Sequence, residues 1–190
     1  GRSTLCRTLV NYAARLGYHP LLVDADAAAP TMGYPRCVTV TNVQSCVEME
    51  EDGGDACGAK TPMLQYYFGS EAPWNNGPMW RHVLQNMRRA ILDRCARMDR
   101  TRVGGIVVDF PVMSTRALDT YETLRTTDSD AEDPIGAILD TVDLLEVDTV
   151  LVVGDDLLRW RICQRLYANN GGSVKTHVAT IKTNRDTEDT

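Results

Sequence analysis

Two neighbouring stretches decide the fold: GRSTLCRTLVNYAARL at residues 1–16 and LLVDAD at residues 21–26. In the first stretch, apolar residues recur at the three- and four-residue spacing of an amphipathic helix. Gly17 ends that pattern, and Pro20 leads into a short apolar run that predicts a buried strand ending at Asp24. A helix followed by a buried strand with acidic residues at its end is typical of an alternating α/β chain.

The same alternation continues along the chain. The patterns predict helices over 3–16, 79–98, 135–145 and 157–167, and strands over 21–24, 37–40, 63–68, 106–108, 149–153 and 178–181. Short apolar strands that alternate with amphipathic helices indicate βαβ units. We therefore expect an α/β, three-layer fold with a mostly parallel sheet, in which ligands bind beyond the carboxyl ends of the strands.

Composition narrows the class of protein. The 190 residues carry a formal net charge of −6, and 43% of them are hydrophobic, which is enough for a core. The negative charge argues against a broad nucleic-acid-binding surface, although it leaves room for a local basic groove. No window approaches the roughly 18 unbroken apolar residues of a membrane helix, so we expect no membrane contact. Six cysteines without CxxC spacing and three scattered histidines give zinc little support and favour a reducing compartment.

The first four residues carry the strongest chemical signal. Gly1-Arg2-Ser3-Thr4 resembles the end of a Walker A motif, GxxxxGK[ST], with Arg2 in place of the lysine. In that motif backbone N–H groups cradle phosphates, the lysine bridges the terminal phosphates, and the following hydroxyl ligates magnesium. Gly1, Arg2, Ser3 and Thr4 are therefore the candidate nucleotide-binding residues. The alternative is that Ser3 or Thr4 is an ordinary helix N-cap.

Acidic residues follow two of the predicted strands. Asp24 and Asp26 lie on the same side of an extended segment, and Asp109 follows the strand at 106–108. Beside a phosphate site, Asp24 and Asp26 can hold magnesium together with Ser3, and one carboxylate can act as general base toward an attacking hydroxyl. Asp26 is the candidate base. The alternative is a solvated strand end.

Four segments carry a family resemblance: STLCRTLVNYA at 3–13, VDAD at 23–26, LQYYFGS at 64–70 and EVDTVLVV at 146–153. Together they resemble the P-loop RNA 5′-hydroxyl polynucleotide kinase family, and within it the kinase subunits of the pre-mRNA cleavage and polyadenylation machinery. The resemblance covers nearly the whole chain and only the family's central domain. We therefore expect a single P-loop kinase-like domain over 1–190, without the first strand, most of the P-loop and the family's N- and C-terminal domains.

The resemblance implies ATP, magnesium and transfer of the terminal phosphate to an RNA 5′-hydroxyl. The chain departs from the family at four parts of that site. Arg2 replaces the lysine, and Ala28-Ala29 replace Gly-Gln. The family has Thr and then Gly-Trp where this chain has Asp109, Pro111 and Val112, and Leu157 aligns with a lid arginine. Arg159, Arg161 and Arg165 are the remaining lid candidates. Phosphoryl transfer depends on positioning and charge stabilisation, so such losses compound.

These departures favour an ATP-binding, catalytically degenerate subunit, a pseudoenzyme that acts as a scaffold in pre-mRNA 3′-end cleavage and polyadenylation in the nucleus. By resemblance we expect the cleavage-factor scaffold subunit as a partner, with the tRNA-splicing endonuclease complex and RNA as further candidates. One alternative is an active, ATP-dependent polynucleotide 5′-hydroxyl kinase with remodelled catalytic groups. Another is an unrelated P-loop ATPase of the deviant-Walker type, which requires the resemblance at 64–70 to be accidental.

Overall fold

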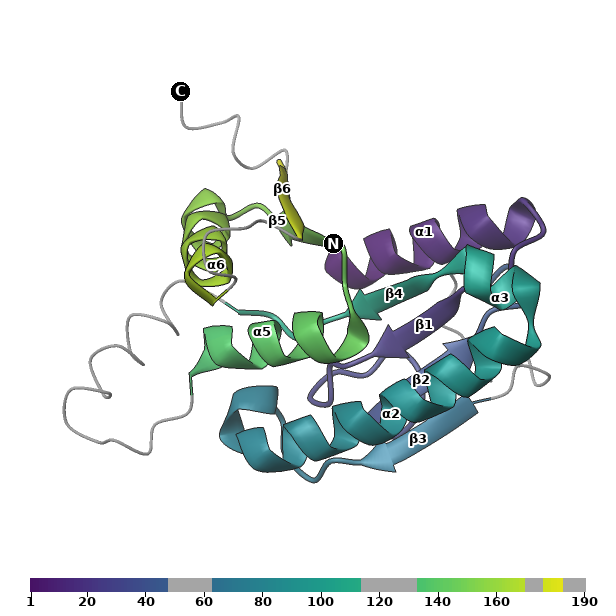
Figure 1. The fold of residues 1–190 in the computed structure, drawn as a ribbon, viewed down its shortest axis with the longest axis horizontal. Coiled ribbons are helices and arrows are strands. Elements are labelled where there is room, and N and C mark those ends of the chain that lie inside the picture. The colour runs from purple at the N-terminus through teal and green to yellow at the C-terminus, as the bar shows by residue number, and fades with distance from the viewer. Residues whose placement is uncertain (48–62, 114–132, 170–175, 183–190) are drawn as a thin grey trace. The chain divides into compact units, whose positions relative to one another are not determined.

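The computed structural model describes residues 1–47, 63–113, 133–169 and 176–182 (Figure 1). The chain divides into two compact units, Gly1–Val112 and Met113–Thr190. The expectation of a single domain over 1–190 stays a prediction, and each unit is described by itself below.

The first unit is built on a four-stranded sheet. Its elements are α1 (Arg2–Arg15), β1 (Leu21–Asp24), β2 (Cys37–Asn42), β3 (Met63–Tyr67), the short 3-10 helix η1 (Pro73–Asn75), α2 (Gly77–Arg97), α3 (Asp99–Gly104) and β4 (Ile106–Asp109). The strand order is β3-β2-β1-β4. Helices α1 and α2 lie on opposite faces of this sheet (Figure 1). The α/β layering expected from the alternating pattern is therefore confirmed.

The strand directions correct the expectation of a mostly parallel sheet. β1 and β4 are parallel, but β1 pairs with β2, and β2 with β3, in antiparallel fashion. The reason is the kind of connection, because parallel neighbours need a long crossover that usually carries a helix. The link from β1 to β4 carries α2 and α3, whereas the described residues between β1, β2 and β3 contain no helix. The sheet is therefore mixed.

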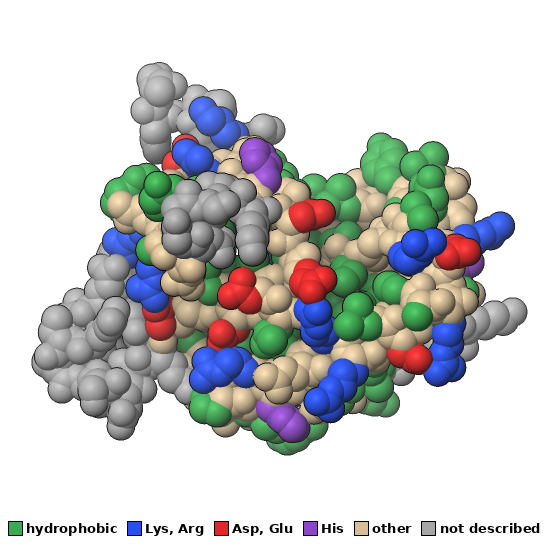
Figure 2. All heavy atoms as spheres, in the orientation of Figure 1, with side chains coloured by type: hydrophobic (Ala, Val, Ile, Leu, Met, Phe, Trp, Pro, Cys, Tyr) green, Lys and Arg blue, Asp and Glu red, His purple; other side chains and the backbone are tan. Residues whose placement is uncertain are grey.

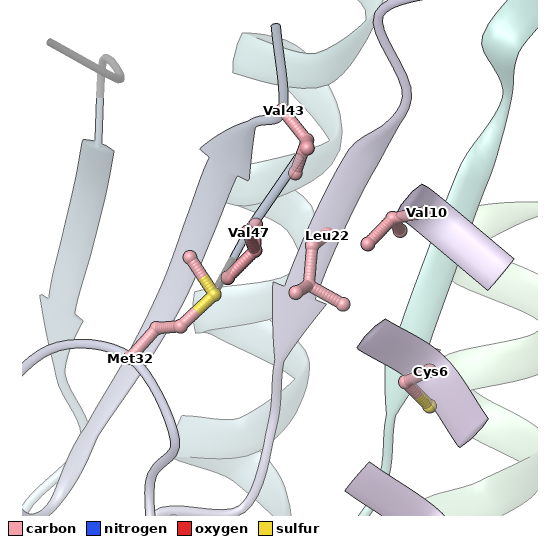
Figure 3. Close-up of a cluster of buried hydrophobic side chains, with 6 residues drawn as sticks. All are labelled: Cys6, Val10, Leu22, Met32, Val43 and Val47. Carbon is pink, nitrogen blue, oxygen red and sulfur yellow. The ribbon is translucent and has the colours of Figure 1, made fainter. Parts of the chain in front are cut away.

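One face of the sheet is closed by α1. Cys6 and Val10 of α1 point toward Leu22 of β1 (Figure 3), in a buried cluster that also contains Met32, Val43 and Val47. Asn11 holds Val47 in this cluster through two hydrogen bonds. Its side chain donates to the Val47 carbonyl over 2.9 Å and accepts from the Val47 N–H over 2.8 Å. Because side chains alternate along a strand, Leu21 and Val23 of β1 face the opposite side of the sheet.

The opposite face carries α2. Asn76 caps this helix by accepting from the Met79 N–H, and the buried stripe repeats at helical spacing through Trp80, Val83, Leu84, Met87 and Ile91. Trp80 is fully buried and packs edge-on between Phe68, at 5.5 Å, and Phe110, at 6.2 Å between ring centroids. The tryptophan is thus part of the core. Phe110 directly follows β4, so this packing also supports the end of that strand.

The second unit contains α5 (Pro134–Leu145), β5 (Thr149–Val153), α6 (Asp156–Asn169) and β6 (His177–Ile181). β5 and β6 are parallel neighbours joined through α6, which is the predicted βαβ arrangement. α5 is apolar on most of its surface and buries eight of its residues, among them Ile135, Ile138 and Leu145. Among the described residues, no helix is long and apolar enough to cross a membrane.

Charge is mixed over the visible surface. In Figure 2, basic and acidic side chains of the described residues alternate over this face rather than forming one basic patch. This distribution agrees with the low pI of about 5.0.

Candidate functional site

The candidate site lies where α1 begins beside the carboxyl ends of two parallel strands. Asp24 is the last residue of β1, Asp109 is the last residue of β4, and the two are register partners. Asp26 follows two residues after Asp24. Because the carboxyl ends of parallel strands meet at one edge of the sheet, all three carboxylates gather there. All three residues are buried, although charged groups rarely are unless they are paired.

Arg2 joins two of these carboxylates. Its Nη2 lies 2.7 Å from Asp26 Oδ2, and its Nε lies 3.1 Å from Asp109 Oδ1. The Arg2 side chain is 27% exposed, whereas Asp26 is 8% and Asp109 is 3% exposed. The fork of the guanidinium can donate to two acceptors at once, so one cation satisfies both buried anions. We call this three-residue contact the Arg2 bridge.

Asp24 is satisfied in a different way. Its Oδ2 accepts from the Thr31 N–H over 2.7 Å, the Met32 N–H over 2.8 Å and the Thr31 hydroxyl over 3.0 Å. Its Oδ1 accepts from the Asp26 N–H over 3.2 Å. Burial raises the pKa of Asp24 above its ordinary value, and the donors of Met32 and Thr31 oppose that rise. Asp24 therefore shapes the loop after β1.

The start of α1 holds the four residues predicted to bind nucleotide. Gly1 is the N-cap, and its carbonyl accepts from the Leu5 N–H over 3.0 Å. Ser3 is half-buried and Thr4 is exposed, and both lie inside the first turn. The alternative that Ser3 or Thr4 caps the helix is therefore wrong. The structure brings Arg2 and Asp26 together, while Gly1, Ser3 and Thr4 as nucleotide-binding residues stay a prediction.

The two carboxylates predicted to hold the magnesium ion that the family resemblance implies are already engaged by other groups. Of the predicted ligands Ser3, Asp24 and Asp26, Asp24 accepts hydrogen bonds on both oxygens, and Asp26 is engaged by Arg2. The second Asp26 oxygen accepts from the Ala29 N–H over 3.2 Å, in the segment where the family carries Gly-Gln. Within the part of the chain that the structure describes, no group of three His, Cys, Asp or Glu side chains is placed to hold a metal ion.

Cys6 lies one turn into α1, beside the site. Its thiol contacts the Val108 carbonyl at 3.9 Å, just before Asp109. Burial and the negative charge of Asp109 raise the pKa of Cys6 to about 12, and the Arg2 charge acts in the opposite direction. Cys6 is therefore a small apolar packing residue rather than a nucleophile.

The lid candidates lie in the second unit. Arg165 forms an ion pair with Asp133, whose other oxygen accepts from the Ile135 N–H at the start of α5. Arg159 lies 3.7 Å from Asp156 on the exposed side of α6. Arg161 also lies in α6 and is half-buried. Acidic neighbours thus contact Arg159 and Arg165, and the lid role of all three arginines stays a prediction.

The Arg2–Asp109 contact is the feature that sequence reasoning missed. The sequence identifies Asp109 as an acid at the end of a strand, but its partner lies 107 residues away. The available signal was an unusual arginine together with an unusual aspartate at two positions of one family site. Such opposite charges can compensate each other, provided that the fold brings them into contact.

Comparison with known proteins identifies the family. The family model "mRNA cleavage and polyadenylation factor CLP1 P-loop" matches residues 1–127. Protein CLP1 homolog from Drosophila mojavensis is 33% identical over 109 residues, and polyribonucleotide 5′-hydroxyl-kinase Clp1 from Danio rerio is 30% identical over 109 residues. Each match covers 57% of this chain and 24% of the relative, so the chain spans about a quarter of the length of these relatives.

A solved structure shows the same fold. Clp1p, in a structure that describes its extended interface with Pcf11p, superimposes with a TM-score of 0.67 at 18% identity. The match covers 95% of this chain and 41% of that chain. A wild-type Clp1p–Pcf11p complex gives a TM-score of 0.65 at 17% identity. The α/β P-loop fold is thereby confirmed, and the alternative of an unrelated P-loop ATPase is wrong. Because the family model covers more than half of its residues, this chain belongs to the CLP1 P-loop family.

Proposed function

We propose that this domain belongs to a catalytically degenerate, polynucleotide-kinase-like subunit that acts as a scaffold in pre-mRNA 3′-end processing. The Arg2 bridge is the single observation that carries the proposal. In a working P-loop the basic residue before the hydroxyl reaches the terminal phosphates. Here that charge is engaged by Asp26 and Asp109, at 2.7 and 3.1 Å.

The Arg2 bridge weakens two catalytic requirements at once. A phosphate that recruits Arg2 must first separate it from buried Asp109, and breaking such a contact costs about 2–4 kcal/mol because an anion is left unpaired. That cost corresponds to about 30-fold or more in affinity. Asp26, the candidate base, also has one oxygen on Arg2 and the other on the Ala29 N–H, so both of its oxygens are engaged by groups other than an attacking hydroxyl.

The similar proteins suggest a ligand, a protein partner and a cellular compartment for this proposed scaffold. One solved Clp1p structure concerns its interface with Pcf11p and the loss of ATP in a glycine-to-arginine point mutant. By this likeness we propose ATP as the ligand, held weakly here, and a cleavage-factor subunit as the partner, in the nucleus. The tRNA-splicing endonuclease complex and RNA are further candidate partners. Magnesium is not part of the proposal, because both carboxylates that would bind it are engaged by other groups.

An active polynucleotide 5′-hydroxyl kinase is the second candidate. One observation favours it: a cation, Arg2, and a carboxylate, Asp26, are kept within 2.7 Å of each other at the start of α1. If substrate binding separates this pair, Arg2 could serve phosphate and Asp26 the attacking hydroxyl. The two candidates therefore differ in whether phosphate is transferred.

Phosphate transfer from terminally labelled ATP to a 5′-hydroxyl RNA oligonucleotide tests the proposal. The intact protein is compared with Asp26→Ala, and an active kinase is run beside them. We expect no transfer above the Asp26→Ala level. Transfer that is lost in Asp26→Ala would establish the kinase. The double variant Arg2→Lys with Asp109→Thr restores the residues that the family resemblance implies, and we expect its ATP affinity to exceed that of the wild type.

A further inference from the structure

We propose that Arg2 is a resident cation that takes the place of a divalent metal between Asp26 and Asp109, so that this site is independent of magnesium. The inference deepens the proposed function, on which it rests, by assigning the Arg2 bridge a specific electrostatic role. Asp26 and Asp109 place two negative charges in a nearly buried position, and Arg2 supplies one positive charge in contact with both.

Burial of two neighbouring carboxylates favours a counter-ion between them. Asp26 is 8% and Asp109 is 3% exposed, so water screens these carboxylates poorly. Proteins solve this problem with a metal ion or with a basic side chain, and magnesium is commonly held by one or two carboxylates plus water. Arg2 lies on both carboxylates, so it provides the charge compensation that an ion would otherwise supply.

The choice of arginine follows from the geometry. Two different nitrogens of one guanidinium, Nε and Nη2, face the two different carboxylates. A lysine carries its charge on a single flexible nitrogen and cannot span two acceptors with the same planar fork. The arginine at this position is therefore suited to bridging the carboxylates, whereas the lysine of a Walker A motif is suited to reaching phosphate.

Asp24 does not add a third ligand. Its oxygens accept from the Asp26 and Met32 N–H groups and from both donors of Thr31, so it is held by the loop. If Arg2 is removed, the carboxylates that it contacted are those of Asp26 and Asp109. We expect such a site to bind a divalent cation weakly, with a Kd of about 0.1–1 mM.

Direct binding of Mn²⁺, followed by electron paramagnetic resonance, tests the inference on the intact protein. Arg2→Met removes the cation and keeps an apolar stem. The matched control is Arg36→Met, which removes another arginine of the same unit from its ion pair with Glu71 at 3.0 Å. We expect Arg2→Met to bind one Mn²⁺ more than the wild type and Arg36→Met to bind no more than the wild type. The added ion should be lost in Arg2→Met with Asp109→Asn.

Two results would overturn the inference. The first is a folded Arg2→Met protein, with a native circular dichroism spectrum, that gains no Mn²⁺. The second is wild-type protein that binds Mn²⁺ in a manner abolished by Asp109→Asn. This second comparison needs no Arg2 variant, so it decides the question even if Arg2→Met does not fold. Neither readout involves phosphate transfer, so a kinase activity would overturn the proposed function without being confused with either result.

Discussion

Asp24 and Asp109 end neighbouring parallel strands in register, yet the chain satisfies them in opposite ways. Asp24 accepts from neutral donors no more than eight residues further along. Asp109 accepts from a charged side chain 107 residues away. The difference shows that two buried aspartates at one sheet edge can have separate roles. Local donors make Asp24 the anchor of its loop, whereas a tertiary ion pair makes Asp109 part of the Arg2 bridge.

The comparison of Asp24 with Asp109 predicts that the largest loss of stability follows substitution of Asp24, the anchor of its loop. Asp24→Ala leaves three N–H groups and one hydroxyl without their acceptor, and we expect the free energy of unfolding to fall by about 3–5 kcal/mol. Asp24→Asn keeps one acceptor oxygen and should lose less. Chemical denaturation monitored by fluorescence measures both. A loss below about 1 kcal/mol in Asp24→Ala would show that water replaces the carboxylate and that the loop needs no anchor.

The next effect concerns the Arg2 bridge. Arg2→Met leaves two buried carboxylates without their cation, so we expect a loss of about 2–4 kcal/mol, somewhat reduced because Arg2 is partly exposed. A double-mutant cycle with Asp109→Asn should give a coupling energy of about 1–3 kcal/mol. The exposed pair Arg36–Glu71 serves as the reference cycle and should stay below about 1 kcal/mol. Equal coupling in both cycles would mean that burial gives the Arg2 bridge no special strength.

The smallest effect is on reactivity rather than stability. With a pKa of about 12, Cys6 has only about one thiolate in 10,000 at pH 8, so a thiol reagent should label exposed Cys46 and spare Cys6 in the folded protein. Mass spectrometry locates the label. The rate at Cys6 should rise tenfold per pH unit below pH 12. Fast labelling of Cys6 at pH 8 would show that the edge between α1 and β4 opens, which would weaken the view of the Arg2 bridge as a closed site.

Much of the fold follows from local patterns. The apolar spacing in 3–16 and 79–98 predicts helices that the structure places at Arg2–Arg15 and Gly77–Arg97, with shifts of one or two residues at the ends. The run at 106–108 and the acid after it predict the strand that the structure places at Ile106–Asp109. These signals are reliable because burial of one helix face, or of both strand faces, restricts residue choice within a short window.

The site was predictable only in outline. Walker-like spacing directs attention to Gly1-Arg2-Ser3-Thr4, and strand ends direct it to Asp24, Asp26 and Asp109. The donors that hold Asp24 belong to a loop without a regular pattern, so no periodicity reveals them. The same holds for Arg2. Whether its guanidinium binds a phosphate, takes the place of a metal ion or pairs with carboxylates depends on which groups lie within about 3 Å of its nitrogens.

Residue order alone establishes the alternation of helices and strands, the family resemblance, and the position of a phosphate-loop-like start beside acidic strand ends. Folding in three dimensions then sets the directions of β2 and β3, because direction depends on how the chain returns to its neighbour rather than on the apolar pattern within a strand. It also sets the partners of Arg2, because residues 2, 26 and 109 meet only after β1 and β4 pair in register. Short-range spacing encodes which face is buried, whereas long-range contact decides which buried charges neutralise one another.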